Sequence, residues 1–192
     1  MSRLPQSPPR HRRHKEAWGG EFFVTFNVNE RDRMNGPQAS GPLGTVDENG
    51  VTLSAAGMIV RELWEELPRL FRSVDIGESV VMPDHFHGIL HLKPAVVGNQ
   101  VSFKPLNQIV AALKSVSSKR INELDGRPGR AFWQRGFYDR IVRDEKIHRR
   151  VSAYILNNPR ALFRRLKPHG PDNSSGGLQS ATTIIRAPER SG

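Results

Sequence analysis

The chain has 192 residues, 36% of them hydrophobic and 25% charged, which is enough for one hydrophobic core and short for two domains. It contains no cysteine, so disulfide frameworks, thiolate metal sites and cysteine catalysis are excluded. No apolar run approaches the roughly 18 residues of a membrane span, and the basic N-terminus leads into no apolar stretch of signal-peptide length. We therefore expect a cytoplasmic protein with no membrane segment.

The formal net charge of +10 is concentrated in two blocks. Residues 1–15 hold five Lys and Arg and no acid, and residues 126–169 hold twelve against three acids. A basic block inside a folded segment favours a polyanionic partner, because each neutralised phosphate releases condensed counterions. The alternative is a basic surface that serves solubility.

Three regions are predicted along the chain. Residues 1–17 are rich in Pro and Arg and form a basic, disordered arm; residues 18–168 form the folded domain; residues 169–192 form a disordered tail.

Apolar periodicity predicts the element order βαββαβα in the folded part. The expected ranges are 21–28, 57–71, 74–82, 85–92, 106–124, 132–142 and 144–158. We expect residues 29–52 to be a long loop, Ser54 to cap the first helix, that helix to be kinked at Pro68, and Pro159 to end the last helix. The central hairpin matches an α+β, ferredoxin-like split βαβ fold, in which an antiparallel sheet carries its helices on one face.

The third predicted strand opens with Asp84-His85-Phe86-His87-Gly88. Because strand side chains alternate faces, His85 and His87 project to one side, where they can share a metal ion, and Phe86 projects to the other. We expect Gly88 to leave room beside the histidines. The alternative is a half-exposed pair without a ligand. His91 has the same parity but lies roughly 13 Å further along the strand at ~3.3 Å per residue, too far for a third ligand.

Tyr154 and Asn158 lie four residues apart, on one face of the last predicted helix, so a phenol and an amide look into one site. Each also has an ordinary interpretation. Tyr154 suits a helix boundary, and asparagine is common at helix ends.

Three segments together resemble a known family: ESVVMPDHFHGILHL (78–92), FWQRGFYDRIVRDE (132–145) and YILNNP (154–159). Over about residues 20–165 the chain is similar to the HUH-type single-tyrosine, IS200-like transposases, and among them to the REP-associated tyrosine transposases. The resemblance implies that His85, His87 and Asn158 bind a divalent metal and that Tyr154 is the nucleophile. It implies single-stranded DNA with hairpin-forming inverted repeats as the substrate. Asp84 departs from the Asn that relatives often carry.

The chemistry of these residues agrees with the resemblance. A divalent ion, expected to be Mg²⁺ or Mn²⁺, would polarise the scissile phosphate, and Zn²⁺ and Ni²⁺ are also compatible with two histidines. Tyr138 is the other tyrosine of the chain, and we expect it to pack in a strand. Trp133 either seals the core, which we favour, or stacks on an unpaired base.

The function predicted from the sequence is a metal-dependent single-stranded DNA endonuclease and strand transferase that works through a 5′-phosphotyrosine. The alternatives are a non-catalytic hairpin-binding protein and a metal phosphoesterase that uses water. The sequence leaves open whether the protein is a monomer or a homodimer, and a bacterial, nucleoid-associated location would follow from the function. The expected phosphate contacts are Lys114, Lys119, Arg120, Arg135, Arg140 and Arg143.

Overall fold

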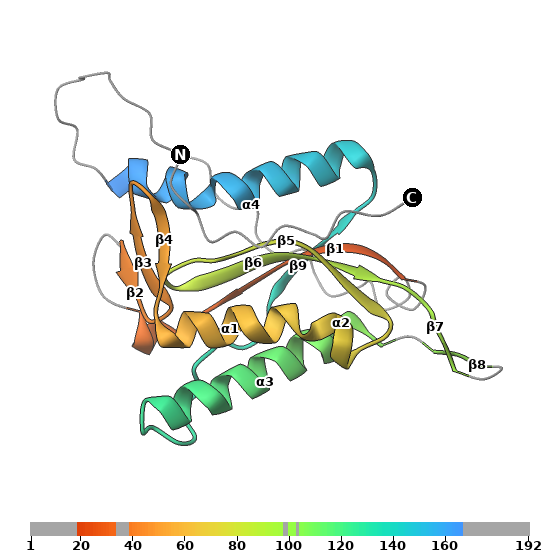
Figure 1. The fold of residues 1–192 in the computed structure, drawn as a ribbon, viewed down its shortest axis with the longest axis horizontal. Coiled ribbons are helices and arrows are strands. Elements are labelled where there is room, and N and C mark those ends of the chain that lie inside the picture. The colour runs from red at the N-terminus through yellow and green to blue at the C-terminus, as the bar shows by residue number, and fades with distance from the viewer. Residues whose placement is uncertain (1–18, 34–38, 98–99, 103, 167–192) are drawn as a thin grey trace.

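A computed structural model describes residues 19–33, 39–97, 100–102 and 104–166 (Figure 1). Its main sheet has the strand order β5-β6-β1-β9, and each pair of neighbours is antiparallel. The strands are β1 (Gly20–Asn27), β5 (Val74–Val81), β6 (His85–Leu92) and β9 (Tyr138–Val142). The predicted arm and tail, residues 1–17 and 169–192, lie outside the described residues.

The helices connect these strands in the split βαβ manner. They are α1 (Ala55–Glu65), α2 (Leu67–Leu70), α3 (Leu106–Leu124) and α4 (Glu145–Leu166). Strand β6 lies between β1 and β5, which the first helices connect, and β1 lies between β6 and β9, which α3 connects. The predicted α+β, ferredoxin-like fold is therefore confirmed.

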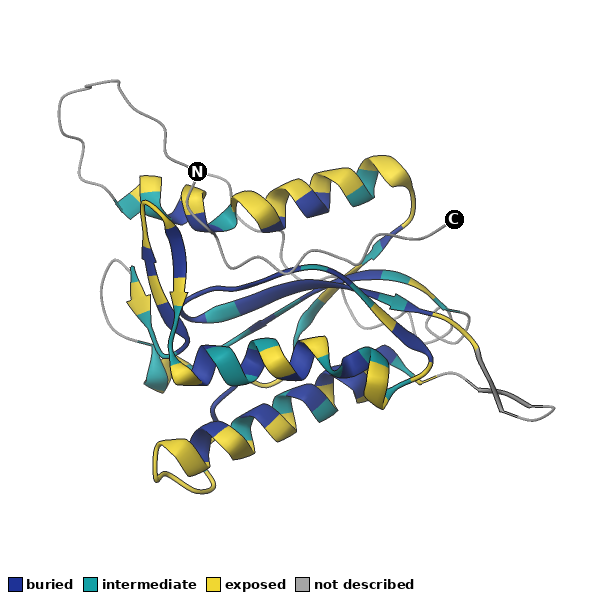
Figure 2. Cartoon of the chain, viewed as in Figure 1, coloured by how far each residue is buried: buried dark blue, intermediate teal, exposed yellow. Residues whose placement is uncertain are grey.

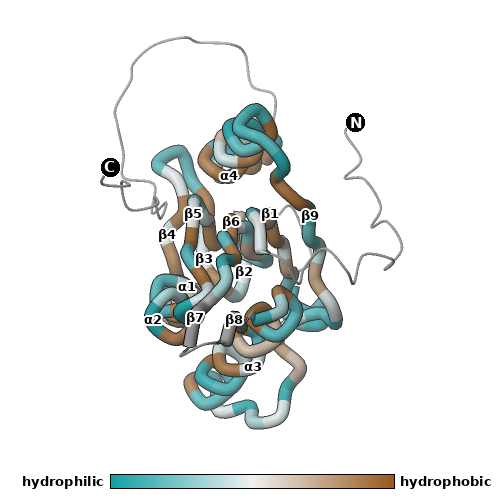
Figure 3. Tube along the Cα trace, turned by 90° about the vertical axis from the view of Figure 1, so that its right-hand side faces the viewer, coloured by the Kyte–Doolittle hydropathy of each residue, from teal (hydrophilic) through white to brown (hydrophobic). Residues whose placement is uncertain are grey.

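The helices cover both faces of the sheet, which corrects the expectation of one covered face. Helices α1, α2 and α3 lie on one side and α4 on the other (Figure 1). The reason is that the strands are apolar on both sides: Phe22 and Phe26 of β1 belong to the core under α1 and α3, whereas Phe23 belongs to the core under α4. Figure 2 shows the sheet as a largely buried layer between these helices, and Figure 3 shows the same layers from the side.

The segment expected to be a loop, residues 29–52, contains a short 3-10 helix and a second sheet. The elements are η2 (Glu30–Asp32), β2 (Ser40–Gly41), β3 (Gly44–Asp47) and β4 (Gly50–Leu53). Val46 and Val51 from β3 and β4 are buried in the core that α4 covers. The alternation of buried and exposed residues is too short here to stand out among the glycines. A further hairpin, β7 (Ala95–Val97) and β8 (Gln100–Ser102), was not predicted.

Of the other predicted boundaries, the cap of the first helix is confirmed and the start of the last strand is wrong. Ser54 does cap α1, accepting a hydrogen bond from the Gly57 N–H at 3.1 Å, and the helical segment is interrupted at Glu66, just before Pro68. However, β9 starts at Tyr138 instead of residue 132.

Among the described residues, no helix is long and apolar enough to span a membrane.

Helix α4 continues past Pro159, so the prediction that it ends there is wrong. Its last turns bury Leu162 and pack Phe163 and Leu166 against the core of the α4 face. This burial offsets the hydrogen bond that Pro159 cannot donate, because each fully buried apolar side chain contributes about 2 kcal/mol. The consequence is that Asn158 stays within a helix.

Candidate active site

His85 and His87 face α4 from neighbouring positions of β6, and their ring centroids are 4.6 Å apart. Phe86 points to the opposite face, where it is fully buried against Phe26 and Trp64, with centroids 4.9 and 4.7 Å away. The predicted alternation is thus confirmed. The histidines are not equally exposed, because His87 is 4% exposed and His85 is intermediate.

Gly88 does not make room for the histidines, contrary to our expectation. It faces the other side of the sheet, where an added Cβ would lie 2.6 Å from Cζ2 of Trp64 and 2.9 Å from Cε1 of Phe86. The glycine therefore accommodates the indole ring in the core beneath α1.

The imidazole of His85 is held by Asp84. Nδ1 of His85 lies 2.6 Å from Oδ1 of Asp84, and Arg33 binds the other carboxylate oxygen through Nη2 at 2.5 Å and Nε at 2.8 Å. Burial raises the pKa of Asp84, but the hydrogen bonds and charges of His85 and Arg33 outweigh burial and lower this pKa to about 2. Since an ionised carboxylate can only accept, Nδ1 of His85 donates, and Nε2 is the nitrogen free for a ligand.

The imidazole of His87 is held by Thr25 on the neighbouring strand, with Oγ1 of Thr25 2.7 Å from Nδ1. Nε2 of His87 is buried and has no hydrogen-bond partner among the residues that the structure describes. Burial, followed by the charge of His85, lowers the pKa of His87 well below its usual value, so the ring is neutral. A neutral, buried imidazole with an unpartnered nitrogen has the properties of a metal ligand.

Tyr154 lies over these residues from α4. Its ring meets His87 edge-on at a centroid distance of 5.3 Å and Phe23 at 6.0 Å, while 42% of the residue stays exposed. Phe23 also stacks on His87 at 5.5 Å. Sequence reasoning missed Phe23 and Thr25, although both have the same parity on the first strand.

Asn158 is half-buried on α4, one turn after Tyr154. Tyr154 and Asn158 share a face of α4, and among the described residues no hydrogen bond joins Asn158 to His85 or His87. Among residues 19–33, 39–97, 100–102 and 104–166, no group of three His, Cys, Asp or Glu is arranged for metal binding. The set implied by the resemblance contains two histidines and one amide, which is not a group of that kind.

Tyr138 lies closer to this site than the sequence suggested. It pairs with Thr25 across β1 and β9, and its half-buried ring meets Phe23 edge-on at 6.4 Å. The two tyrosines differ in that the ring of Tyr154 pairs with the ring of His87, whereas within the described part of the chain the ring of Tyr138 pairs with neither histidine ring.

A second set of polar contacts holds the first half of α4 against the sheet. Nδ1 of His148 contacts Oε1 of Glu21, and Ser152 donates to Oε2 of Glu78 at 3.0 Å. Glu21 also approaches His91 at 3.5 Å. These contacts hold the part of α4 that precedes Tyr154 against the sheet.

The expected phosphate contacts fall on different faces. Arg140 lies opposite Phe23 in the sheet register and is exposed on the α4 side, and Arg143 is exposed just after β9. Lys119 and Arg120 are exposed on α3, which covers the other face, and Arg135 is exposed in the loop before β9.

Lys114 has a structural role in addition to any it has toward DNA. Its Nζ donates to the backbone oxygens of Gln134 and Gly136 at 2.7 and 2.5 Å, and burial lowers its pKa.

Trp133 is 6% exposed and donates from Nε1 to Ser117 at 2.8 Å, which agrees with its expected place in the core.

Comparison with known proteins identifies the family. Residues 59–158, just over half of the chain, match the family described as IS200-like transposases, and this segment contains His85, His87, Tyr154 and Asn158. The chain belongs to the IS200-like transposase family.

A protein of Haemophilus influenzae described as uncharacterized is 30% identical over 152 residues, which cover 73% of this chain and 80% of that protein. A solved structure of a REP-associated tyrosine transposase bound to a REP hairpin is 18% identical and has a TM-score of 0.46. That comparison covers 96% of this chain and 99% of the other, and it adds no residue assignment to the site.

Proposed function

We propose that this protein is a metal-dependent single-stranded DNA endonuclease and strand transferase with Tyr154 as its nucleophile. The observation that carries the proposal is the approach of the Tyr154 ring to His87, whose Nε2 atom is buried without a partner in the described part of the chain. Membership of a transposase family supports a DNA-processing role.

His85, His87 and Asn158 would hold the metal, for which we propose Mg²⁺ or Mn²⁺. Two features of the chain fit such an ion: no described residue bonds to Nε2 of His87, and Asp84 occupies Nδ1 of His85, which leaves Nε2 of that ring available. Nitrogen and amide oxygen ligands suit divalent first-row metals, and a bound ion would polarise the phosphate that is attacked.

In the proposed step, the phenol oxygen of Tyr154 forms a bond to the scissile phosphorus while the bond from phosphorus to the 3′ oxygen breaks. The phenol loses its proton and the departing 3′ oxygen gains one, so the products are a 5′-phosphotyrosine and a free 3′-hydroxyl. The phosphodiester bond is exchanged and not hydrolysed. A 3′-hydroxyl from another strand can therefore reverse the step and join the DNA.

The exposure of Tyr154 suits this role, since 42% of the residue is open to a strand that approaches α4 from outside. For the partner we propose single-stranded DNA with hairpin-forming inverted repeats, as in REP-associated transposases. The basic block of residues 126–169 supports a polyanion, because Arg140 and Arg143 extend from the edge strand next to the site. A nucleoid-associated location stays a prediction.

The test uses single-stranded oligonucleotides that carry the inverted repeats flanking the gene, labelled at the 3′ end. With Mn²⁺, the wild-type protein should transfer the label to a band that survives denaturation and carries the protein. Cleavage without this adduct would favour a phosphoesterase that uses water. Tight binding without cleavage in any divalent metal would favour a non-catalytic hairpin-binding protein.

A further inference from the structure

The carboxylate of Asp84 bridges Arg33 and His85. One oxygen accepts from Nε and Nη2 of Arg33, and the other accepts from Nδ1 of His85. The Asp84 side chain is 8% exposed, against 37% for Arg33. The guanidinium therefore reaches from the surface to a buried anion, which in turn holds a candidate ligand.

The 3-10 helix η2 places Arg33 for this contact. The backbone N–H of Arg33 donates to the backbone oxygens of Asn29 and Glu30. The backbone N–H of Val28, just before η2, donates to the backbone oxygen of Asp84 at 2.9 Å. Arg33 and Asp84 are thus connected through the main chain as well as through their side chains.

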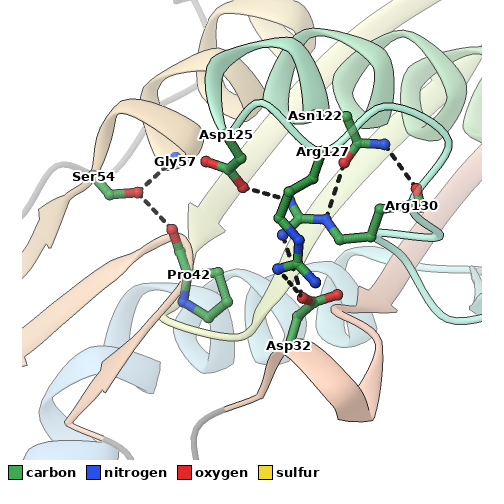
Figure 4. Close-up of polar contacts among 8 residues, drawn as sticks. All are labelled: Asp32, Pro42, Ser54, Gly57, Asn122, Asp125, Arg127 and Arg130. Atoms are coloured by element: carbon green, nitrogen blue, oxygen red, sulfur yellow. Dashed lines mark hydrogen bonds and ion pairs between the residues drawn. The ribbon is translucent and has the colours of Figure 1, made fainter.

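The preceding residue, Asp32, ties η2 to the end of α3 (Figure 4). Oδ1 of Asp32 lies 3.3 Å from Nη1 of both Arg127 and Arg130. Arg130 is itself held by Asn122 at 3.0 Å and by Asp125 at 2.5 Å. Asp32, the last residue of η2, therefore binds the segment at the end of α3, and Arg33, the residue after it, binds Asp84.

We propose that Arg33 is a positioning residue for the candidate metal site: acting through Asp84, it holds His85 in the orientation that leaves Nε2 for the metal, and Asp32 anchors η2 in support. This inference rests on the proposed function, because it needs His85 to be a ligand. Nothing in the family match assigns it, since that match begins at residue 59.

A carboxylate behind a ligating imidazole fixes its tautomer and ring orientation, and loss of such a partner typically costs about 10–100-fold in metal affinity. The carboxylate needs a partner of its own, because a buried anion without one is strongly destabilising. Arg33 supplies that partner, and its planar guanidinium directs two donors at one oxygen.

The experiment compares wild type with Arg33→Gln, Asp84→Ala and Asp84→Asn. Arg31→Gln is the matched control, since it removes the same charge two residues earlier, within η2, where Arg33 is the residue that binds Asp84. Two quantities are measured for each protein: the tautomer of His85, from the ¹⁵N shifts of the metal-free protein, and the affinity for Mn²⁺, by calorimetry. Melting curves verify that each variant is folded.

We expect Arg33→Gln to weaken Mn²⁺ binding about 10-fold and to populate the other tautomer or a second ring orientation of His85. Asp84→Ala should lose the tautomer preference and up to about 100-fold in affinity. Asp84→Asn keeps an oxygen that accepts from Nδ1, so it should retain the tautomer. A merely structural role would instead affect both Asp84 variants alike in melting temperature and leave the His85 shifts unchanged.

If Arg33→Gln matches Arg31→Gln in both tautomer and affinity while wild type binds Mn²⁺, the positioning role is overturned and the proposed site stands. If wild type binds no Mn²⁺, both the site and the role of Arg33 in it are overturned. The two failures are therefore distinguishable in one series.

Discussion

The ring of Tyr154 lies edge-on to the imidazole of His87, with centroids 5.3 Å apart. Helix α4 carries the phenol and strand β6 carries the imidazole, so the contact depends on how the helix docks on the sheet. Since Tyr138 also packs near Phe23, the two tyrosines provide a matched pair for testing the nucleophile.

Removing the hydroxyl as Tyr154→Phe should abolish both cleavage and the denaturation-resistant adduct while keeping DNA affinity, because the ring contacts with His87 and Phe23 remain. Tyr138→Phe should retain cleavage and adduct. Gel analysis of a 3′-labelled hairpin oligonucleotide reads both outcomes. An adduct that persists in Tyr154→Phe and is lost in Tyr138→Phe would assign the nucleophile to Tyr138.

Metal binding should depend on both histidines, but the two alanine variants should differ in stability. His85→Ala should lose Mn²⁺ binding and metal-dependent cleavage, and the loss of its hydrogen bond to Asp84 should cost about 1 kcal/mol of unfolding free energy. His87→Ala should lose Mn²⁺ binding and cleavage as well, and it should cost about 1–3 kcal/mol of unfolding free energy, because it opens space next to Phe23 where the His87 residue is only 4% exposed. Calorimetry and thermal unfolding measure the two effects. Full cleavage by His87→Ala, or by wild type in excess chelator, would contradict the proposed site.

The faces of the sheet should differ in their contribution to DNA binding. Arg140→Ala, on the side of Tyr154, should weaken binding and reduce the slope of log affinity against log salt by about 0.7, the value for one phosphate contact on a single strand. Arg69→Ala, an exposed residue of α2 across the sheet that is not among the expected phosphate contacts, is the control and should leave the slope unchanged. Equal slopes for the two variants would show that the strand does not follow the α4 face.

Removing the basic N-terminal residues 1–15 should also weaken binding across sequences and make the salt slope shallower. The measurement is fluorescence anisotropy with two unrelated hairpins over a range of salt concentrations. A slope equal to that of the full chain would show that these residues do not contact phosphate.

Gly88→Ala tests which face of the sheet this glycine serves. The new methyl group would lie 2.6 Å from the fully buried Trp64 ring, so we expect a loss of about 1–3 kcal/mol in unfolding free energy. The same change in a Trp64→Phe background should cost less, since the smaller ring vacates that space. Denaturant unfolding of the four proteins gives the cycle. Equal costs in both backgrounds would place the clash elsewhere.

The charge of Asp84 should stabilise the metal-free protein in a pH-dependent manner. The pKa of this carboxyl falls from 3.8 to about 2 on folding, so its stabilisation is complete above about pH 5 and declines as the pH falls toward 2. The difference in unfolding free energy between wild type and Asp84→Asn should be about 2 kcal/mol at pH 6 and about half of that at pH 3. A difference that stays constant over this range would show that the carboxylate charge does not contribute.

The sequence by itself determined the βαββαβα order of the main elements and which of their side chains share a face, but not the small strands of residues 40–53 and 95–102. Alternation along residues 85–92 placed His85 and His87 together and Phe86 opposite, and helical spacing placed Tyr154 near Asn158. These are local periodicities that follow from the geometry of a strand and a helix, so they need no knowledge of the rest of the chain.

Tertiary structure decided everything that depends on which element packs against which. The sequence could not show that α4 covers the face opposite α1 and α3, that Gly88 serves Trp64, or that the helix continues past Pro159, because each depends on apolar partners distant in the chain. It also gave no sign of the Arg33 contact with Asp84, since these residues are 51 positions apart and come together only through the strand register and the position of η2. Local geometry sets faces, whereas burial against distant neighbours selects the arrangement.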